Sequence, residues 1–282
     1  MADFLADLQQ HAFLQHAVIT GILAAIPCGV IGTYVVTRRI TYIAGAIAHS
    51  VLAGLGAARF CQVTCGWPWL HPLYGAVAAS IVSALIIGLV SLYARQREDT
   101  VIGAVWAIGM ALGILFIFKT PGYNEDLMSY LFGNILMVSS DDLQLILGLD
   151  ILVLVFSLLF YNKLLAVCFD DEFARLRGVR VDLYYLLLLC LTALTVVLLV
   201  TVVGVVMVIA LLTLPVAVAS HFSNRLWLTM AVSAGLTILF TISGLALSYG
   251  PDLPAGATTI VLAGGVYLVV AAADAVRVRK NG

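Results

Sequence analysis

The chain has 282 residues, of which 63% are hydrophobic and only 10% are charged, and its net charge is −1 at pH 7. A soluble domain is about a quarter charged, so this composition excludes a soluble globular protein and predicts an integral membrane protein. The near-zero net charge provides no basic surface for nucleic acid, and we expect no nucleic-acid partner.

Runs of about 20 apolar residues, the length that crosses a bilayer, recur along the whole chain and predict an all-α polytopic membrane protein. We expect nine membrane spans, or eight if the nearly continuous stretch 183–221 is not divided at Val203-Gly204. No segment is typical of a separate soluble domain, so residues 1–282 form a single transmembrane domain. The expected spans are 16–37, 41–60, 73–94, 100–118, 143–162, 183–202, 204–221, 227–248 and 257–276.

The distribution of basic residues predicts the orientation. Cytoplasmic loops of membrane proteins are enriched in Lys and Arg. If Arg38 and Arg39 face the cytoplasm, nine alternating spans place every basic residue there except Arg59 and Lys119. We therefore expect the N-terminus outside and the C-terminus inside.

His49 lies near the middle of the second span, in "AGAIAHSVLAG", with no acidic or basic residue nearby. A titratable side chain at that depth is costly without a partner and marks a transport pathway. The alternative is a histidine that hydrogen-bonds a neighbouring helix and only stabilises the fold.

The predicted outer loop that follows the second span contains Cys61, Cys65 and His71. A soft-metal site there is less favoured than a disulfide or two unpaired thiols, because an extracytoplasmic location promotes oxidation.

Between spans four and five, "NEDLMSYLFGNILMVSSDD" has an apolar core that is too short to cross a bilayer. It predicts a re-entrant or interfacial helix over about 126–138 on the outer side, where such a segment lines a protein-covered or water-filled path. Asp150 follows inside span five, within "LQLILGLDILVLV", and is a second ionisable residue inside the membrane.

A cytoplasmic connection, "NKLLAVCFDDEFARLRGVRVDLYY", predicts a short helix over about 170–180. Acidic residues open it and basic residues close it, which suits the helix dipole, and Gly178 is a candidate for its C-terminal cap. The helix fits either a docking site for a cytoplasmic partner or an ordinary interfacial helix.

The chain lacks a phosphate-binding loop, since its one Lys-Thr pair follows Phe118 and not glycine. The chain is therefore not expected to be an enzyme, and any ATP-driven function requires a separate subunit.

Five stretches occur in the order seen in permease subunits of the zinc and manganese ABC importers: "TRRITYIAGAIAHSVLAG", "DLMSYLFGN", "DEFARLRGVRVD", "ALLTLPVAVAS" and "DLPAGATTIVLAGG". The chain resembles that family over nearly its whole length. The resemblance implies a homodimeric or pseudo-dimeric permease that receives a divalent cation from an extracytoplasmic metal-binding protein. It also implies two cytoplasmic ABC ATPase subunits that dock on a coupling helix at 170–180. The residues expected to contact the ATPase are Glu172, Phe173, Arg175, Leu176, Arg177 and Gly178.

The resemblance also implies metal-binding positions, with two departures. The family typically has an Asp four residues before the His of span two, and that spacing puts both side chains on one helix face. Here His49 matches, but Gly45 stands at the Asp position, and Asn134 stands where zinc members often have Asp. Asp150 would restore the missing carboxylate if spans two and five face each other; alternatively, it is protonated or paired near the membrane interface.

The outer acidic residues Asp126 and Asp252 are candidates for an outer gate, since they raise the local concentration of cations. An N-terminal cap for the last span is an equally good interpretation of Asp252.

We predict a permease in a bacterial inner membrane that imports a divalent transition metal, zinc first and manganese or iron next, without a resident cofactor. A proton-coupled secondary transporter that uses His49 and Asp150 is the alternative.

Overall fold

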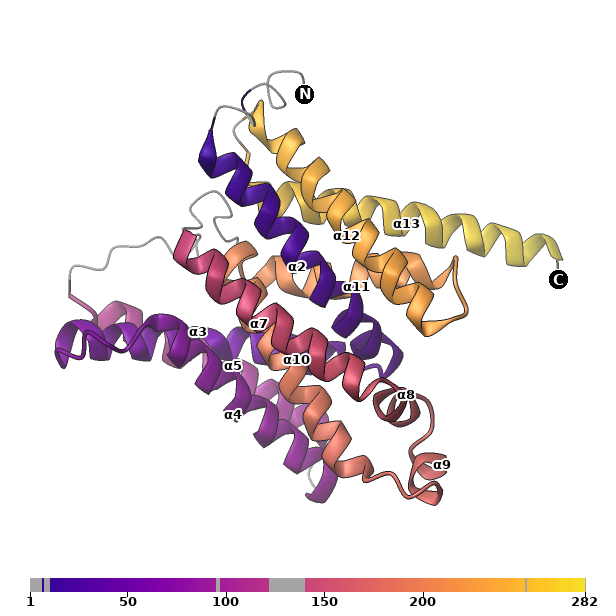
Figure 1. Cartoon of the computed structure of the whole chain (residues 1–282), viewed down its shortest axis with the longest axis horizontal. Helices are drawn as coiled ribbons and strands as arrows, with labels where there is room; N and C mark the ends of the chain where they lie inside the picture. Colours follow the sequence, from indigo (N-terminus) through magenta and orange to yellow (C-terminus); the bar gives the residue numbers. More distant parts are fainter. Residues whose placement is uncertain (1–6, 8–10, 95–96, 122–139, 252, 282) are drawn as a thin grey trace.

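The computed structural model of the chain contains only α-helices among its regular elements, within the residues that it describes (Figure 1). This confirms the all-helical fold class. The predicted re-entrant segment lies outside the described residues, as do Asp126, Asn134 and Asp252. The described residues are 7, 11–94, 97–121, 140–251 and 253–281.

The helices begin and end within a few residues of the predicted spans. The long helices are α2 (Ala12–Thr37), α3 (Thr41–Thr64), α4 (Pro72–Tyr93), α5 (Glu98–Lys119), α7 (Ser140–Leu159), α10 (Val181–Val203), α12 (Leu226–Tyr249) and α13 (Ala255–Asn281). The shorter helices are α8 (Tyr161–Phe169), α9 (Asp171–Leu176) and α11 (Val205–Ser220).

The described residues contain seven helices that are long and apolar enough to cross a membrane. An eighth candidate is formed by α7 and α8, which are bent by 72° relative to each other. The remaining predicted span, 204–221, corresponds to α11. With 16 residues, α11 is about 24 Å long, which is shorter than the roughly 30 Å core of a bilayer. Nine spans and their orientation therefore stay a prediction, whereas a multi-pass membrane protein is confirmed.

A glycine separates α10 from α11, as the sequence predicted. Gly204 has φ 80° and ψ 163°, a backbone conformation that is essentially restricted to glycine. The chain therefore leaves the helix at Val203 and starts a new one at Val205. The nearly continuous apolar stretch hides this break, and only the glycine signals it.

The helices form two groups joined by a central layer (Figure 1). On one side, α3 packs tightly on α4 and α5; on the other, α12 packs on α13. Between the two groups, α2 contacts α7, α11 and α12, and α10 contacts both α4 and α2. Helix α3, which contains His49, therefore packs on α4 and α5 and also on α10 and α11 of the central layer.

Small residues allow the central helices to approach closely. A Cβ at Gly29 of α2 would lie 2.7 Å from the Ala234 Cβ of α12. Beside this contact, the Thr33 hydroxyl donates to the Gly29 carbonyl at 2.6 Å, and the Ser233 hydroxyl reaches the same carbonyl at 3.2 Å. Inside a bilayer polar groups need protein partners, and these hydroxyls find them on their own or the facing helix.

Candidate functional site

His49 is buried at the centre of α3, with only 8% of its surface exposed. Its ring stacks on the indole of Trp106 in α5, with 4.3 Å between ring centroids and 20° between the planes. The buried Nδ1 atom has no hydrogen-bond partner among the described residues. Buried polar atoms usually have partners, so this nitrogen retains a lone pair or proton for a ligand that the described residues do not provide.

Gly45, one helical turn before His49, faces the same indole. A Cβ at Gly45 would lie 3.2 Å from Cζ3 of Trp106 and 3.4 Å from Cδ1 of Ile209 in α11. The volume beside the glycine is thus occupied by side chains from two other helices. The space that an acidic side chain would take at position 45 is therefore not empty, because the Trp106 ring lies there.

Asp150 is also buried, with 3% exposure, and neither of its carboxylate oxygens has a hydrogen-bond partner among the described residues. It lies on α7, which packs on α2, α8 and α10; α3 also packs on α2 and α10, besides α4, α5 and α11. Spans two and five thus share two neighbouring helices, and replacement of the carboxylate at Gly45 by Asp150 stays a prediction. No group of three or more His, Cys, Asp and Glu side chains with metal-binding geometry occurs among the described residues.

Cys61 and Cys65 lie at the end of α3 and form no disulfide in this structure. His71 has a different role: its Nδ1 accepts from the backbone N–H of Leu73 at 3.3 Å and caps the start of α4. This cap, followed directly by Pro72, explains His71 without a metal.

The predicted cytoplasmic helix exists as α9, which covers six residues within the predicted range 170–180. The Asp170 carboxylate accepts from the Phe173 N–H at 2.9 Å and caps its N-terminus. At the other end Gly178 has φ +77°. The N–H groups of Gly178 and Val179 return to the carbonyls of Arg175 and Ala174, both at 3.0 Å. This is the Schellman arrangement, and it confirms Gly178 as the C-terminal capping residue.

The solvent-exposed surface of α9 carries two large apolar side chains among charged ones. Leu176 is 87% exposed and Phe173 is half exposed, while Ala174 is fully buried. The Arg177 guanidinium lies over the Phe173 ring, 5.0 Å from its centroid. Large apolar side chains that project into solvent beside a cation are typical of a protein-binding surface.

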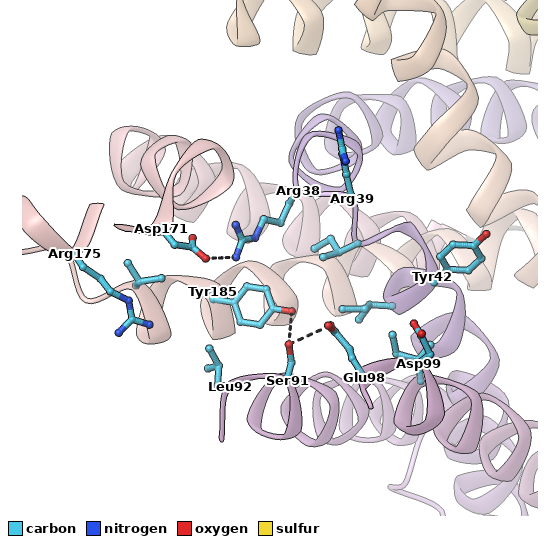
Figure 2. Close-up of a pocket in the computed structure, with 14 residues that line it drawn as sticks. Arg38, Arg39, Tyr42, Ser91, Leu92, Glu98, Asp99, Asp171, Arg175 and Tyr185 are labelled. Carbon is cyan, nitrogen blue, oxygen red and sulfur yellow. Dashed lines mark hydrogen bonds and ion pairs between the residues drawn. The ribbon is translucent and has the colours of Figure 1, made fainter. Parts of the chain in front are cut away.

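A cavity of about 370 Å³ lies beside α9, between the ends of α2, α4, α5 and α10 (Figure 2). Arg38 at the end of α2 forms a 2.5 Å ion pair with Asp171 of α9, and its guanidinium lies 5.6 Å from the ring centroid of Tyr185 in α10. From the facing wall, the Ser91 hydroxyl contacts the Tyr185 hydroxyl at 3.5 Å and donates to Glu98 at 3.1 Å. A continuous polar network thus joins α9 to four long helices.

Comparison with known proteins identifies the family. The family model for the ABC 3 transport family matches residues 10–274. The chain belongs to the ABC 3 transport family. The resemblance inferred from the five sequence motifs is therefore confirmed.

Several relatives that are similar to this chain are named for metal transport. A probable metal transport system membrane protein of Chlamydia trachomatis is 41% identical over 86% of this chain and 83% of its own length. The manganese transport system membrane protein MntC of Halalkalibacterium halodurans is 34% identical, over 94% and 88%. Among solved structures, PsaBC from Streptococcus pneumoniae in complex with Fab has 29% identity and a TM-score of 0.85, covering 95% of this chain and 94% of that chain.

Two features of this ABC 3 family chain escaped the sequence analysis. Trp106 lies in an apolar run where an aromatic residue is unremarkable, and no local pattern relates it to His49, 57 positions earlier in the chain. The Arg38–Asp171 pair joins residues that are 133 positions apart. Both residues are charged and lie near the ends of predicted helices, but nothing in the sequence indicates that they pair with each other.

Proposed function

We propose that the chain is the membrane-spanning permease subunit of an ATP-driven importer of a divalent transition metal. The observation that supports this most directly is His49, a mid-helix imidazole with an unpartnered buried nitrogen in a chain of the ABC 3 transport family. Imidazole nitrogen is a common ligand for divalent transition metals. A single such ligand holds a cation weakly, which suits a residue on a pathway that must release its cargo.

Zinc is the first candidate cargo, followed by manganese and iron. Zinc and iron bind imidazole well, whereas manganese prefers oxygen ligands. Manganese stays a strong candidate because a relative with 34% identity is named as a manganese transport protein. In this proposal an extracytoplasmic metal-binding protein delivers the ion to the outer side, where Asp126, Asn134 and Asp252 form part of the entry path.

The proposed partner for α9 is a cytoplasmic ABC ATPase, and the complete transporter contains two copies of the permease. Phe173 and Leu176 would fill an apolar groove of the ATPase, with Glu172, Arg175 and Arg177 around them. Exposed apolar anchors surrounded by charged residues are common in stable interfaces. The ATPase supplies the energy, and the permease performs no covalent chemistry.

A proton-coupled secondary transporter is the less favoured alternative. It requires His49 and Asp150 to exchange protons, yet neither the His49 Nδ1 atom nor either Asp150 oxygen has a hydrogen-bond partner among the described residues. It also gives no role to the exposed apolar surface of α9. Membership of the ABC 3 transport family argues for an ATP-driven system as well.

ATP-dependent uptake of radioactive zinc by vesicles that contain the permease, its ATPase and its binding protein tests the proposal. Leu176→Asp places a carboxylate in the proposed apolar contact, and burying an unpaired charge costs several kcal/mol. We expect Leu176→Asp to abolish uptake and to prevent co-purification of the ATPase. Phe222→Asp, at another exposed apolar residue (69%) on the same predicted side, is the matched control and should leave both unchanged. Zinc uptake by Leu176→Asp without the ATPase would support the secondary transporter instead.

A further inference from the structure

Trp106 belongs to a face of α5 that is pressed against α3. A Cβ at Gly109 would lie 2.6 Å from the Ser50 Cα, and a Cβ at Gly113 would lie 2.7 Å from the Leu52 carbonyl carbon. Residues 106, 109 and 113 share one helix face, since they follow the three- and four-residue spacing of an α-helix. The two glycines bring the backbones together, and the indole next to them is therefore held firmly against α3.

The contact fixes the plane of the imidazole. The His49 ring lies against one face of a much larger ring, 4.3 Å between centroids and nearly parallel. Rotation of the imidazole out of this plane would lose the stacking contact with the indole. A metal ion binds an imidazole nitrogen in the plane of the ring, so the indole determines the direction from which an ion can approach.

The same indole excludes a second ligand from α3. A Cβ at Gly45 would lie 3.2 Å from Cζ3 and 3.6 Å from Cη2 of Trp106, so even a short side chain at this position would press on the ring and shift it slightly. Helix α3 has no acidic residue, and the acidic residues of α5, Glu98 and Asp99, lie in its first turn. The walls that α3 and α5 provide at His49 thus contain an imidazole nitrogen and no carboxylate.

We propose that Trp106 is a positioning residue that determines the metal selectivity of this pathway. It orients the His49 imidazole and occupies the volume that a carboxylate at position 45 would need. The site therefore favours cations that bind nitrogen well, such as zinc, over cations that prefer carboxylate oxygen, such as manganese. This inference rests on the proposed function, because it requires that a divalent metal passes His49.

The test measures uptake of zinc and of manganese by vesicles that contain the complete transporter, and reports their ratio. Trp106→Phe keeps an aromatic ring and should keep the ratio within about twofold of the wild type. Trp106→Ala frees the imidazole and should lower the zinc-to-manganese ratio about fivefold, since a misplaced ligand weakens the zinc contact most. A Trp106 that only stabilised the fold would reduce both uptakes equally and leave the ratio unchanged.

The second arm of the test places a carboxylate at position 45. Gly45→Asp alone should reduce uptake of both metals, because the new side chain and the indole compete for one volume. Gly45→Asp combined with Trp106→Ala gives the carboxylate room, four residues before His49 on the same helix face. We expect this double variant to shift the ratio toward manganese about tenfold further than Trp106→Ala alone, since manganese prefers carboxylate. Gly45→Asn with Trp106→Ala has the same size without the charge and should not produce the shift.

Two results would overturn the inference: an unchanged ratio in Trp106→Ala, or a full shift toward manganese by Gly45→Asp alone with normal uptake. Both leave the proposed function intact, since the wild-type transporter still moves metal. Failure of the wild-type complex to take up either metal would instead contradict the proposed function itself.

Discussion

Arg38 connects the end of α2 to α9. Its ion pair with Asp171 joins the last turn of α2 to α9, and both side chains are partly exposed, at 25% and 37%. Exposed pairs of this kind contribute about 0–1 kcal/mol to stability. The next residue, Arg39, closes α2 in the left-handed region at φ 62°, which is uncommon for an arginine. The pair thus joins α9 to the turn that leads directly into α3, at little gain in stability.

Removing this pair should uncouple metal transport from ATP hydrolysis. In the assembled transporter we expect Arg38→Gln or Asp171→Asn to lower the zinc imported per ATP hydrolysed about threefold or more, while thermal stability changes by less than about 1 kcal/mol. The reciprocal exchange, Arg38→Asp with Asp171→Arg, should recover part of the loss. Simultaneous measurement of uptake and ATPase activity gives the ratio.

The control for this experiment is Asp182→Asn. It removes another 2.5 Å ion pair, to Arg175, but one that links residues only seven positions apart. The chain already holds these two residues together, so the transport ratio should stay near that of the wild type. An equal loss in Asp182→Asn and Asp171→Asn would contradict a specific role for Arg38.

Among the elements, α9 depends most on its ends. An isolated helix of six residues is unstable because its nucleation cost is not repaid. Asp170 satisfies an N–H at the start, and the backbone turn at Gly178 satisfies two carbonyls at the end. The caps therefore keep α9 folded while Phe173 and Leu176 stay exposed.

Gly178→Ala should loosen α9 through the backbone alone. Nothing lies within 4 Å of a Cβ at this position, so the cost comes from the left-handed φ, about 1 kcal/mol or slightly more. Amide hydrogen exchange at Gly178, Val179 and the last turn of α9 should accelerate about fivefold, as expected for 1 kcal/mol.

The matched control is Gly235→Ala in α12. This glycine also has nothing within 4 Å of a Cβ, but its φ is not positive. Alanine is the better helix former, so exchange in α12 should stay the same or become slower. Unchanged exchange in α9 of Gly178→Ala would show that the cap does not limit its opening.

At the scale of the whole molecule, the orientation follows from charge. The ends of the helices that meet at the cavity of Figure 2 carry Arg38, Arg39 and Arg175. Basic residues stay on the cytoplasmic side during insertion, so this end is predicted to face the cytoplasm together with α9. The aromatic loop that contains Trp67 and Trp69, stacked at 6.2 Å, would then lie outside.

Labelling of single cysteines tests this orientation. In a chain whose native cysteines are replaced by serine, we introduce Trp69→Cys or Leu176→Cys, at residues that are 69% and 87% exposed. A membrane-impermeant maleimide added to intact inner-membrane spheroplasts should label only Trp69→Cys. After the membrane is opened, both should react. Labelling of Leu176→Cys alone in sealed cells would reverse the predicted topology.

Local signals were sufficient for several parts of this protein. Apolar runs predicted the long helices, and Gly204 predicted the break between α10 and α11 because no other residue readily adopts its backbone angles. Acidic and basic residues at 170–180 predicted α9, because capping depends on neighbours a few positions away. The span count was less certain, since α11 is too short for length to decide whether it crosses the membrane.

The sequence by itself thus determined the class of protein, most helix boundaries and the family, all of which depend on composition or on nearby residues, and it made His49 a candidate. Only the tertiary structure decided what surrounds His49 and Asp150: that Trp106 stacks on His49, that Gly45 leaves room for the indole, and that Asp150 is buried without a hydrogen-bond partner among the described residues. In a membrane every helix is apolar on most faces, so periodicity does not indicate which helices pack together. Close packing of small residues decides that, and it acts between residues far apart in the chain.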